Sequence, residues 1–333
     1  MTQLSSVDVA RRAEATAVRL RGYLPATPLV RFDAFSAELD ADVLVKCEHQ
    51  QRTGSFKARG ALAKAMTLSS EQRDRGIVTA STGNHGLGVA NAVRVIGGRA
   101  IVFVPTTASE VKTTALRRLG AELHTHDADP VVVERVARSY ADEHGLVYLP
   151  PYNDPDVIAG QGTAAVELVE QLAGQDVAAV FVNVGGGGLM SGFASVIRHH
   201  LPSVRIYGAS PANDAAMMAS VRAGRVVEVA TAPTLSDGSA GNIEDGTITL
   251  ELCRSLVDEW VSVSEPEIAA ALATVIDTEH QLIEGAAGVA FAAARARRAD
   301  IRGKRIVVLS CGANIASATL AAALGHERDG RKP

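Results

Sequence analysis

The chain of 333 residues is poor in cysteine, in aromatic side chains and in long apolar runs. Its cysteines, Cys47, Cys253 and Cys311, have no CxxC spacing, which excludes a disulfide framework and a zinc finger and indicates reduced thiols. With 4% aromatic residues and a net charge of −4, the chain lacks the stacking platform and the basic stripe of nucleic-acid-binding proteins. No apolar run reaches the ~18 residues of a membrane span, and the polar N-terminus does not resemble a signal peptide. We therefore expect a soluble, cytoplasmic protein without nucleic-acid or membrane partners.

The length predicts about two domains. Between residues 76 and 150, short β-branched runs alternate with helical patterns, which indicates a parallel sheet with helical crossovers. A second series of strands falls at residues 177–184, 205–209, 261–263 and 305–309. Because the last strand comes so late, we expect one large α/β domain, made of residues 1–75 and 151–324, with residues 76–150 inserted as a smaller α/β domain. The polar residues 325–333 are expected to form a disordered tail.

Lys57 follows a glycine turn in the run TGSFKARGA, residues 53–61. A lysine that is buried near apolar neighbours can lose its proton near neutral pH and attack a carbonyl group. The ordinary alternative for any single lysine is a solvated position on a helix. The choice between these interpretations depends on motifs further along the chain.

Four consecutive glycines, Gly185, Gly186, Gly187 and Gly188, follow an apolar strand and precede a helical pattern that starts with Leu189. At such a junction the backbone N–H groups can approach an anion at the positive end of the helix dipole. The run matches neither the dinucleotide fingerprint nor the P-loop. A monophosphate site is therefore favoured over a flexible turn and over a nucleotide site.

Two further polar loops follow predicted strands, where ligands of open α/β sheets bind. In ASTGNHG, residues 80–86, hydroxyl and amide groups could hold a carboxylate or a phenolate oxygen, or Ser81 or Thr82 could simply cap the next helix. In SCGAN, Ser310 and Cys311 end the last strand. A cysteine there is otherwise most often core filler.

Together these motifs resemble those of the fold-type II pyridoxal-phosphate enzymes, specifically the serine/threonine dehydratase and serine racemase family. The other matching runs are VIAGQGT at 157–163, TLSDG at 234–238 and LIEGAAG at 282–288. The resemblance covers nearly the whole chain. It implies a two-lobed α/β fold like that of the tryptophan synthase β chain, in which each lobe is an open, mostly parallel, twisted sheet flanked by helices. It also implies pyridoxal 5′-phosphate as the cofactor.

The resemblance implies a role for each matching residue. Lys57 would carry the cofactor as a Schiff base and remove the Cα proton of the substrate, Phe56 would pack on the pyridine ring, and Asn84 would bind the ring oxygen O3′. The other expected cofactor contacts are Gly185, Gly186, Gly187, Gly188 and Leu189 at the phosphate, Gly238 beside the ring, and Cys311 or Ser310 at the ring nitrogen. The substrate carboxylate would lie among Ser81, Thr82, Gly83 and His85. An ungapped match favours Cys311, whereas Ser310 fits a loop that is one residue longer. Either neighbour is neutral, which favours loss of a β-substituent over transamination.

The chain departs from the family at a cation site that some members carry. Ser210 and Ala216 stand where those members have carboxylates, so that Asp214 alone remains. Hard cations need several oxygen ligands. We expect no divalent metal site of that type.

The resemblance implies an ammonia-lyase that converts a small β-hydroxy amino acid, such as L-serine or L-threonine, to a 2-oxo acid and ammonia. Hydroxyaspartate or a product of hydroxyectoine breakdown is an alternative substrate. Because Thr82 keeps a hydroxyl where racemases of the family place a serine, a serine or hydroxyaspartate racemase stays open, and a non-catalytic binding protein is a remote alternative. The match ends near Leu324 without a regulatory module, which favours a catabolic role. A homodimer is expected because relatives form one.

Overall fold

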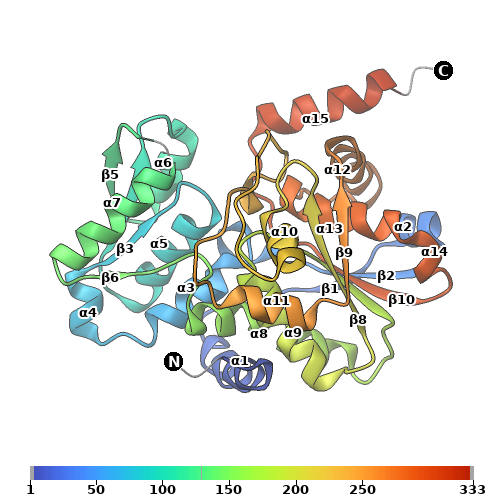
Figure 1. Cartoon of the computed structure of the whole chain (residues 1–333), viewed down its shortest axis with the longest axis horizontal. Coiled ribbons are helices and arrows are strands. Elements are labelled where there is room, and N and C mark those ends of the chain that lie inside the picture. The colour runs from blue at the N-terminus through green and yellow to red at the C-terminus, as the bar shows by residue number, and fades with distance from the viewer. Residues whose placement is uncertain (1–3, 129, 331–333) are drawn as a thin grey trace.

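The structure, a computed structural model, describes residues 4–128 and 130–330. It has two lobes, each built around its own sheet (Figure 1). Both sheets are flanked by helices and are parallel except for one edge strand. The α/β class and the mostly parallel sheets predicted from the sequence are confirmed.

The large lobe contains a six-stranded sheet in the order β1-β2-β10-β7-β8-β9. Its strands are β1 (Leu29–Arg31), β2 (Asp42–Lys46), β7 (Ala179–Asn183), β8 (Arg205–Pro211), β9 (Glu259–Val263) and β10 (Arg305–Leu309). Only β1 pairs antiparallel with its neighbour. The central strands β7 and β10 are almost entirely apolar and buried, as expected for parallel strands that are covered on both faces.

Helices cover both faces of this sheet (Figure 1). Helix α13 (Gly285–Ala296) packs across β7, β8, β9 and β10. On the other side α1 (Ser6–Leu20), α8 (Pro155–Leu172) and α9 (Gly188–His200) pack against one another. The remaining elements of this lobe are α2 (Asp33–Leu39), η1 (Glu48–Gln50), η2 (Arg52–Gly54), α10 (Ala216–Ala223), η3 (Asp237–Ser239), α11 (Thr249–Leu256), α12 (Glu265–Glu279), α14 (Arg298–Ile301) and α15 (Ser317–Gly330).

The small lobe contains a four-stranded parallel sheet in the order β5-β4-β3-β6. Its strands are β3 (Ile77–Ala80), β4 (Ala100–Pro105), β5 (Glu122–His126) and β6 (Val147–Tyr148), and its helices are α4 (Ser70–Arg75), α5 (Asn84–Ile96), α6 (Glu110–Arg118) and α7 (Pro130–Glu143). Helix α3 (Lys57–Ala65) packs on α5 of this lobe and on α8 of the large lobe. Ala58, Ala61 and Leu62 of α3 are buried in the same apolar cluster as the small sheet.

A buried network of charges ties α3 to the large lobe. The Arg59 guanidinium, 1% exposed, donates to Glu48 Oε1 at 2.8 Å and Oε2 at 2.7 Å. It also donates to both carboxylate oxygens of Glu167 on α8, at 2.6 and 2.7 Å. The Lys46 ammonium lies 2.8 Å from Glu167, so two cations balance two carboxylates. Such paired and fully hydrogen-bonded charges are the form in which ions are tolerated inside proteins.

One local feature differs from the sequence-based expectations. The C-terminal helix α15 continues to Gly330, so residues 325–330 are helical rather than disordered, and residues 331–333 lie outside the described range. The alanine- and leucine-rich start of α15 favours a helix that extends into the polar residues. No helix in the described part of the chain is long and apolar enough to cross a membrane.

Candidate active site

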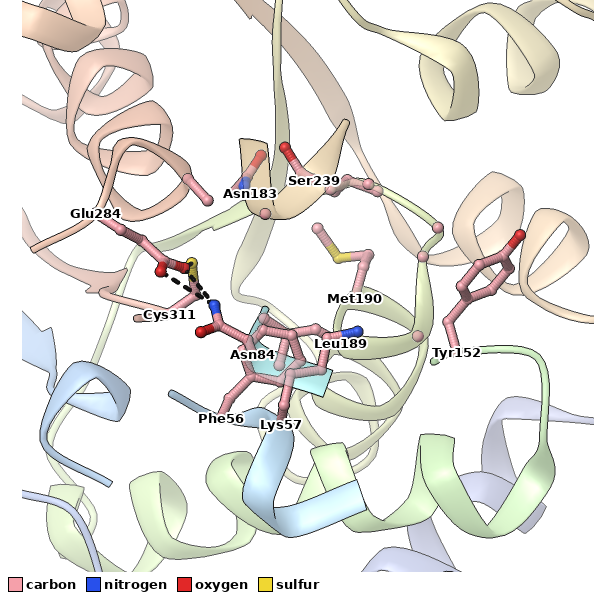
Figure 2. A pocket seen from close by; sticks show the side chains of 17 residues that line it. Phe56, Lys57, Asn84, Tyr152, Asn183, Leu189, Met190, Ser239, Glu284 and Cys311 are labelled. Atoms are coloured by element: carbon pink, nitrogen blue, oxygen red, sulfur yellow. Dashed lines mark hydrogen bonds between the residues drawn. The ribbon is translucent and has the colours of Figure 1, made fainter. Parts of the chain in front are cut away.

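One cavity brings together residues from both lobes. Every residue that the sequence predicts to bind the cofactor lines this cavity except Ser310. Asn84 comes from the small lobe, while the glycine run and Cys311 come from the ends of β7 and β10 in the large lobe. Figure 2 shows Asn84, Glu284 and Cys311 at one end of the cavity and Tyr152 at the other.

Lys57 is the first residue of α3, and a constrained turn precedes it. Thr53 has a φ of 67°, a left-handed conformation that is uncommon for a residue with a side chain. Beyond this turn the backbone N–H of Phe56 donates to the Cys311 carbonyl at 3.1 Å, and Ser55 forms a β-bridge with Gly312. The loop that carries the lysine is thereby joined to the loop that carries Cys311.

The Lys57 amine faces the interior of the site. Its Nζ donates to the carbonyl oxygen of Pro151 at 2.9 Å and lies 5.3 Å from the centre of the Phe56 ring. Burial lowers the pKa of Lys57 to about 8, although Cys311 and Glu284 act in the opposite direction. A neutral, nucleophilic amine is therefore accessible near neutral pH.

The glycine run forms a cradle that side chains would fill. A Cβ atom at Gly186 would lie 2.4 Å from the ring of Tyr152, and Gly187 has a φ of +83°. Helix α9 begins at the next residue, Gly188. Bare backbone N–H groups and the positive end of the helix dipole thus face one side of the cavity, which suits a phosphate group.

The cavity also contains the carboxylate of Glu284, to which the sequence alone assigns no role. Glu284, 2% exposed, accepts hydrogen bonds from Asn84 Nδ2 at 2.9 and 3.0 Å and from the Asn314 backbone N–H at 3.0 Å. Burial raises the pKa of Glu284 to about 7, against the lowering effect of the Asn84 and Asn314 hydrogen bonds. Its signal in the sequence is a lone acidic residue within the apolar run LIEGAAG.

Cys311 and Ser310 differ in their access to the cavity. Cys311 lines it, whereas the Ser310 hydroxyl is fully buried and has no hydrogen-bond partner within the described part of the chain. Burial and the nearby Glu284 raise the pKa of the Cys311 thiol well above its ordinary value. Cys311 is therefore a neutral group at physiological pH, and the geometry favours it over Ser310 as the neighbour of a bound ring.

The residues predicted to surround the substrate carboxylate, Ser81, Thr82, Gly83 and His85, do not line this cavity. His85 is buried, and its Nε2 lies 3.0 Å from the Leu149 carbonyl oxygen. Burial lowers the pKa of His85 to about 3, so the ring is neutral. Contacts between this loop and a substrate therefore stay a prediction.

Other cavity residues were not singled out as ligand contacts by the sequence. The Tyr152 hydroxyl accepts a hydrogen bond from the Glu244 backbone N–H at 3.0 Å, and burial raises its pKa to about 12. Asn183, immediately before the glycine run at the end of β7, has a buried side-chain oxygen without a partner among the described residues. A polar residue at that strand end is the signal that identifies it.

The structure shows the contacts of two residues at the position where some family members bind a cation. Asp214 Oδ2 accepts the Gly241 backbone N–H at 2.7 Å, and Ser210 donates to the Val184 carbonyl. Asp214 Oδ1 is buried without a hydrogen-bond partner in the described part of the chain, so the absence of a cation there stays a prediction. A group of side chains with metal-ligand spacing, Glu14 with His199 and His200, lies on α1 and α9, apart from the residues that line the cavity.

Comparisons with known proteins cover nearly the whole chain. A family model described as pyridoxal-phosphate dependent enzyme matches residues 20–312. The chain is 39% identical over 296 residues to an L-threonine ammonia-lyase of Thermotoga maritima, covering 89% of this chain and 73% of the relative. It is 36% identical to an L-threo-3-hydroxyaspartate ammonia-lyase of a Pseudomonas species, covering 94% and 96% of the two chains.

A racemase and a solved structure extend the comparison. The serine racemase of Schizosaccharomyces pombe is 34% identical, over 92% of this chain and 93% of the relative. The solved structure of the processed form of threonine deaminase isoform 2 from Solanum lycopersicum superposes with a TM-score of 0.90 at 32% identity, covering 97% of this chain and 94% of that one. The similarity thus includes both the sequence and the arrangement of the two lobes.

Proposed function

Because the chain belongs to the fold-type II pyridoxal-phosphate enzymes of the serine/threonine dehydratase and serine racemase family, we propose that it is an ammonia-lyase for a small β-hydroxy amino acid. The favoured substrates are L-serine and L-threonine, and the products are a 2-oxo acid and ammonia. Its cofactor is pyridoxal 5′-phosphate. The observation that carries the proposal is the depressed pKa of Lys57, about 8, in a cavity lined by the glycine run.

The residues of the cavity fit this cofactor. The Lys57 amine suits its aldehyde, and the glycine cradle at the start of α9 suits its phosphate, since Tyr152 leaves no space there for larger residues. We propose that Phe56 and Gly238 flank the ring, that Asn84 donates to the ring oxygen, and that Cys311 neighbours the ring nitrogen. All of these residues line the same cavity.

The bound cofactor supplies a ring system that withdraws electrons from the Cα atom of the amino acid. Lys57 acts as the general base at that atom, because a pKa near 8 leaves part of its amine neutral at physiological pH. The substrate loses its Cα proton to Nζ. Its β-hydroxyl group leaves as water by taking up a proton, and the proton held on Nζ balances this step and returns the amine to its neutral form. Water then hydrolyses the unsaturated product to the 2-oxo acid and ammonia. The Cys311 thiol stays neutral throughout.

Whether racemisation accompanies elimination depends on Thr82. Racemisation requires a proton donor on the face opposite to the base, and Thr82 is the candidate donor that the sequence offers. Thr82 is not among the residues that line the cavity. The lining residues within the described part of the chain include one lysine, Lys57, and no arginine or histidine, so a second substrate carboxylate would need a cation from outside this cavity.

A substrate panel tests the proposal. The purified holoenzyme is incubated with L-serine, L-threonine and both hydroxyaspartate diastereomers, and 2-oxo acid and ammonia are measured together with chiral analysis of the remaining substrate. We expect equal amounts of 2-oxo acid and ammonia from serine or threonine. Faster formation of D-serine than of pyruvate would establish a racemase instead.

Lys57→Ala tests the role of the lysine in the same assay. We expect the variant to lose its visible absorption band. Its lyase activity should fall by at least about a thousandfold. Lys304→Ala is the matched control, because Lys304 donates to the Asp300 carbonyl at 2.8 Å on the surface. A colourless wild-type protein that ignores added cofactor would instead indicate a binding protein.

A further inference from the structure

The side-chain amide of Asn84 is held in one orientation by two partners. Its Oδ1 accepts from Asn314 Nδ2 at 2.6 Å, and its Nδ2 donates to the Glu284 carboxylate at 2.9 and 3.0 Å (Figure 2). In its ionised form, which predominates above its pKa of about 7, the Glu284 carboxylate only accepts hydrogen bonds, so it can pair with the NH₂ end of an amide but not with the oxygen end. Glu284 therefore fixes which end of the amide points into this part of the cavity.

The carboxylate is itself fixed from several sides. The Glu284 backbone N–H donates to the Gly312 carbonyl at 2.9 Å, and Oε2 accepts the Asn314 backbone N–H at 3.0 Å. A Cβ atom at Gly312 would lie 2.4 Å from Oε1, so the side chain fills the space that this glycine leaves. Glu284 also precedes α13, whose positive dipole end favours an anion.

We propose that Glu284 is a positioning residue, whose carboxylate orients the Asn84 amide so that an N–H group is presented to the ring oxygen of the cofactor. The proposal rests on the contact between Asn84 and the cofactor proposed above. The Asn84 amide has two N–H protons. Both Glu284 oxygens lie within 3.0 Å of Nδ2, as expected when they share one N–H, and this sharing would leave the second N–H for the ring oxygen. If the amide turned over, Oδ1 would face that oxygen and repel it.

The charged groups that face Glu284 are compatible with this role. They are Lys57 from α3 and Asp237 from η3, and the Cys311 thiol lies 3.9 Å from Oε1. Lys57 favours the ionised carboxylate and Asp237 disfavours it. Because Asn84 opens α5 of the small lobe while Glu284 and Asn314 belong to the large lobe, the same hydrogen bonds join the two lobes beside the cofactor.

The test measures the bound cofactor without substrate, so its outcome does not depend on which amino acid reacts. Glu284→Gln, Asn84→Ala and the double variant are purified as holoenzymes, and their visible absorption is titrated with pH. The dissociation constant of pyridoxal phosphate is measured by fluorescence titration of the apoproteins. Glu279→Gln is the control, because Glu279 likewise accepts one backbone N–H, that of Phe35 at 2.9 Å, outside the cavity.

We expect Glu284→Gln and Asn84→Ala to shift the absorption titration in the same direction and to weaken cofactor binding by about tenfold, as for loss of a charge-assisted hydrogen bond. The double variant should be no worse than Asn84→Ala, because Glu284 acts through Asn84. Glu279→Gln should match the wild type. A wild-type spectrum in Glu284→Gln, or additive effects in the double variant, would overturn the proposal.

Two further variants keep the test decisive if Glu284→Gln fails to fold. Glu284→Asp retains the charge but is one methylene too short to reach Asn84, so it should show the altered titration. Asn314→Ala removes the donor to Asn84 Oδ1 and should give a smaller shift in the same direction. Wild-type spectra in both variants would contradict the proposed positioning role.

Discussion

At the scale of single residues, the surroundings of an amine determine its chemistry. Lys57 and Lys64 are both on α3, seven residues apart. Burial lowers the pKa of Lys57 to about 8. For Lys64, burial is outweighed by Asp154 and Asp156, which raise its pKa. One helix thus carries a lysine that can act as a base and another that stays charged.

This contrast predicts different reactivities in the apoprotein. Trinitrobenzenesulfonate modifies neutral amines, so labelling of Lys57 should increase about tenfold per pH unit below pH 8 and level off above it. Labelling of Lys64 should still increase at pH 10. Peptide mass spectrometry after timed labelling measures both sites in one sample. A Lys57 midpoint near 10.5 would contradict the burial argument.

The site could be predicted from the sequence only in part. There is a physical reason why some of its residues could be identified and others could not. Lys57, the glycine run and Asn84 each stand beside a turn or strand end that marks them locally. Glu284 contributes through contacts with distant segments, such as the Asn84 amide at 2.9 Å across the lobes. No local pattern encodes a contact of that kind. The position of His85 follows likewise from burial against Leu149.

At the scale of elements, α3 is the segment on which the site depends most. It carries Lys57 at its first turn and is anchored by Arg59 two residues later. The Arg59 guanidinium makes short hydrogen bonds to Glu48 and Glu167. These bonds keep the first turn of α3 attached to the large lobe.

Removing the cation from this network should destabilise the protein strongly. Arg59→Met leaves the fully buried Glu48 without its main partner, and we expect the free energy of unfolding to fall by about 3–5 kcal/mol. Urea unfolding of the apoprotein, followed by circular dichroism, measures the change. Arg254→Met, which breaks a surface pair with Glu251 on α11, should have no measurable effect. Similar stabilities for the two variants would be inconsistent with a structural role for the network.

Strands were easier to predict from the sequence than their pairing. The apolar, β-branched runs of β3, β4, β7 and β10 identify these strands directly. The position of β10 between β2 and β7 results from contacts between segments more than 100 residues apart. The short strand β1 has a mixed, partly exposed pattern, so nothing in its composition distinguishes it from an extended loop.

At the scale of the whole molecule, the cofactor should stabilise the fold because residues of both lobes line the cavity proposed to hold it. A ligand that binds only the native state adds about 2.7 kcal/mol at a concentration of 100 times its dissociation constant. We expect pyridoxal phosphate to raise the melting temperature of the apoprotein by several degrees. Differential scanning calorimetry across a concentration series checks this. The increase should be much smaller in Lys57→Ala and unchanged in Lys304→Ala.

The two lobes have separate sheets but share a helix. Small-lobe residues such as Val89 and Ile77 share an apolar cluster with Ala58 and Leu62 of α3, and α3 also packs on α8 of the large lobe. The sequence-based domain boundary at residue 75 therefore passes through a shared core. An alternation of strands and helices shows where a sheet begins, but not which neighbouring helix completes its core.

Because α3 is anchored to the large lobe, two of the residues proposed to contact the cofactor are attached to different lobes. Lys57 is fixed to the large lobe through Arg59, Glu48 and Glu167, whereas Asn84 opens α5 and belongs to the small lobe. If the small lobe rotates about α3 relative to the large lobe, the Lys57 amine keeps its position and the Asn84 amide moves. The distance between these two groups would then change with the angle between the lobes, and the visible absorption of the bound cofactor would change with it.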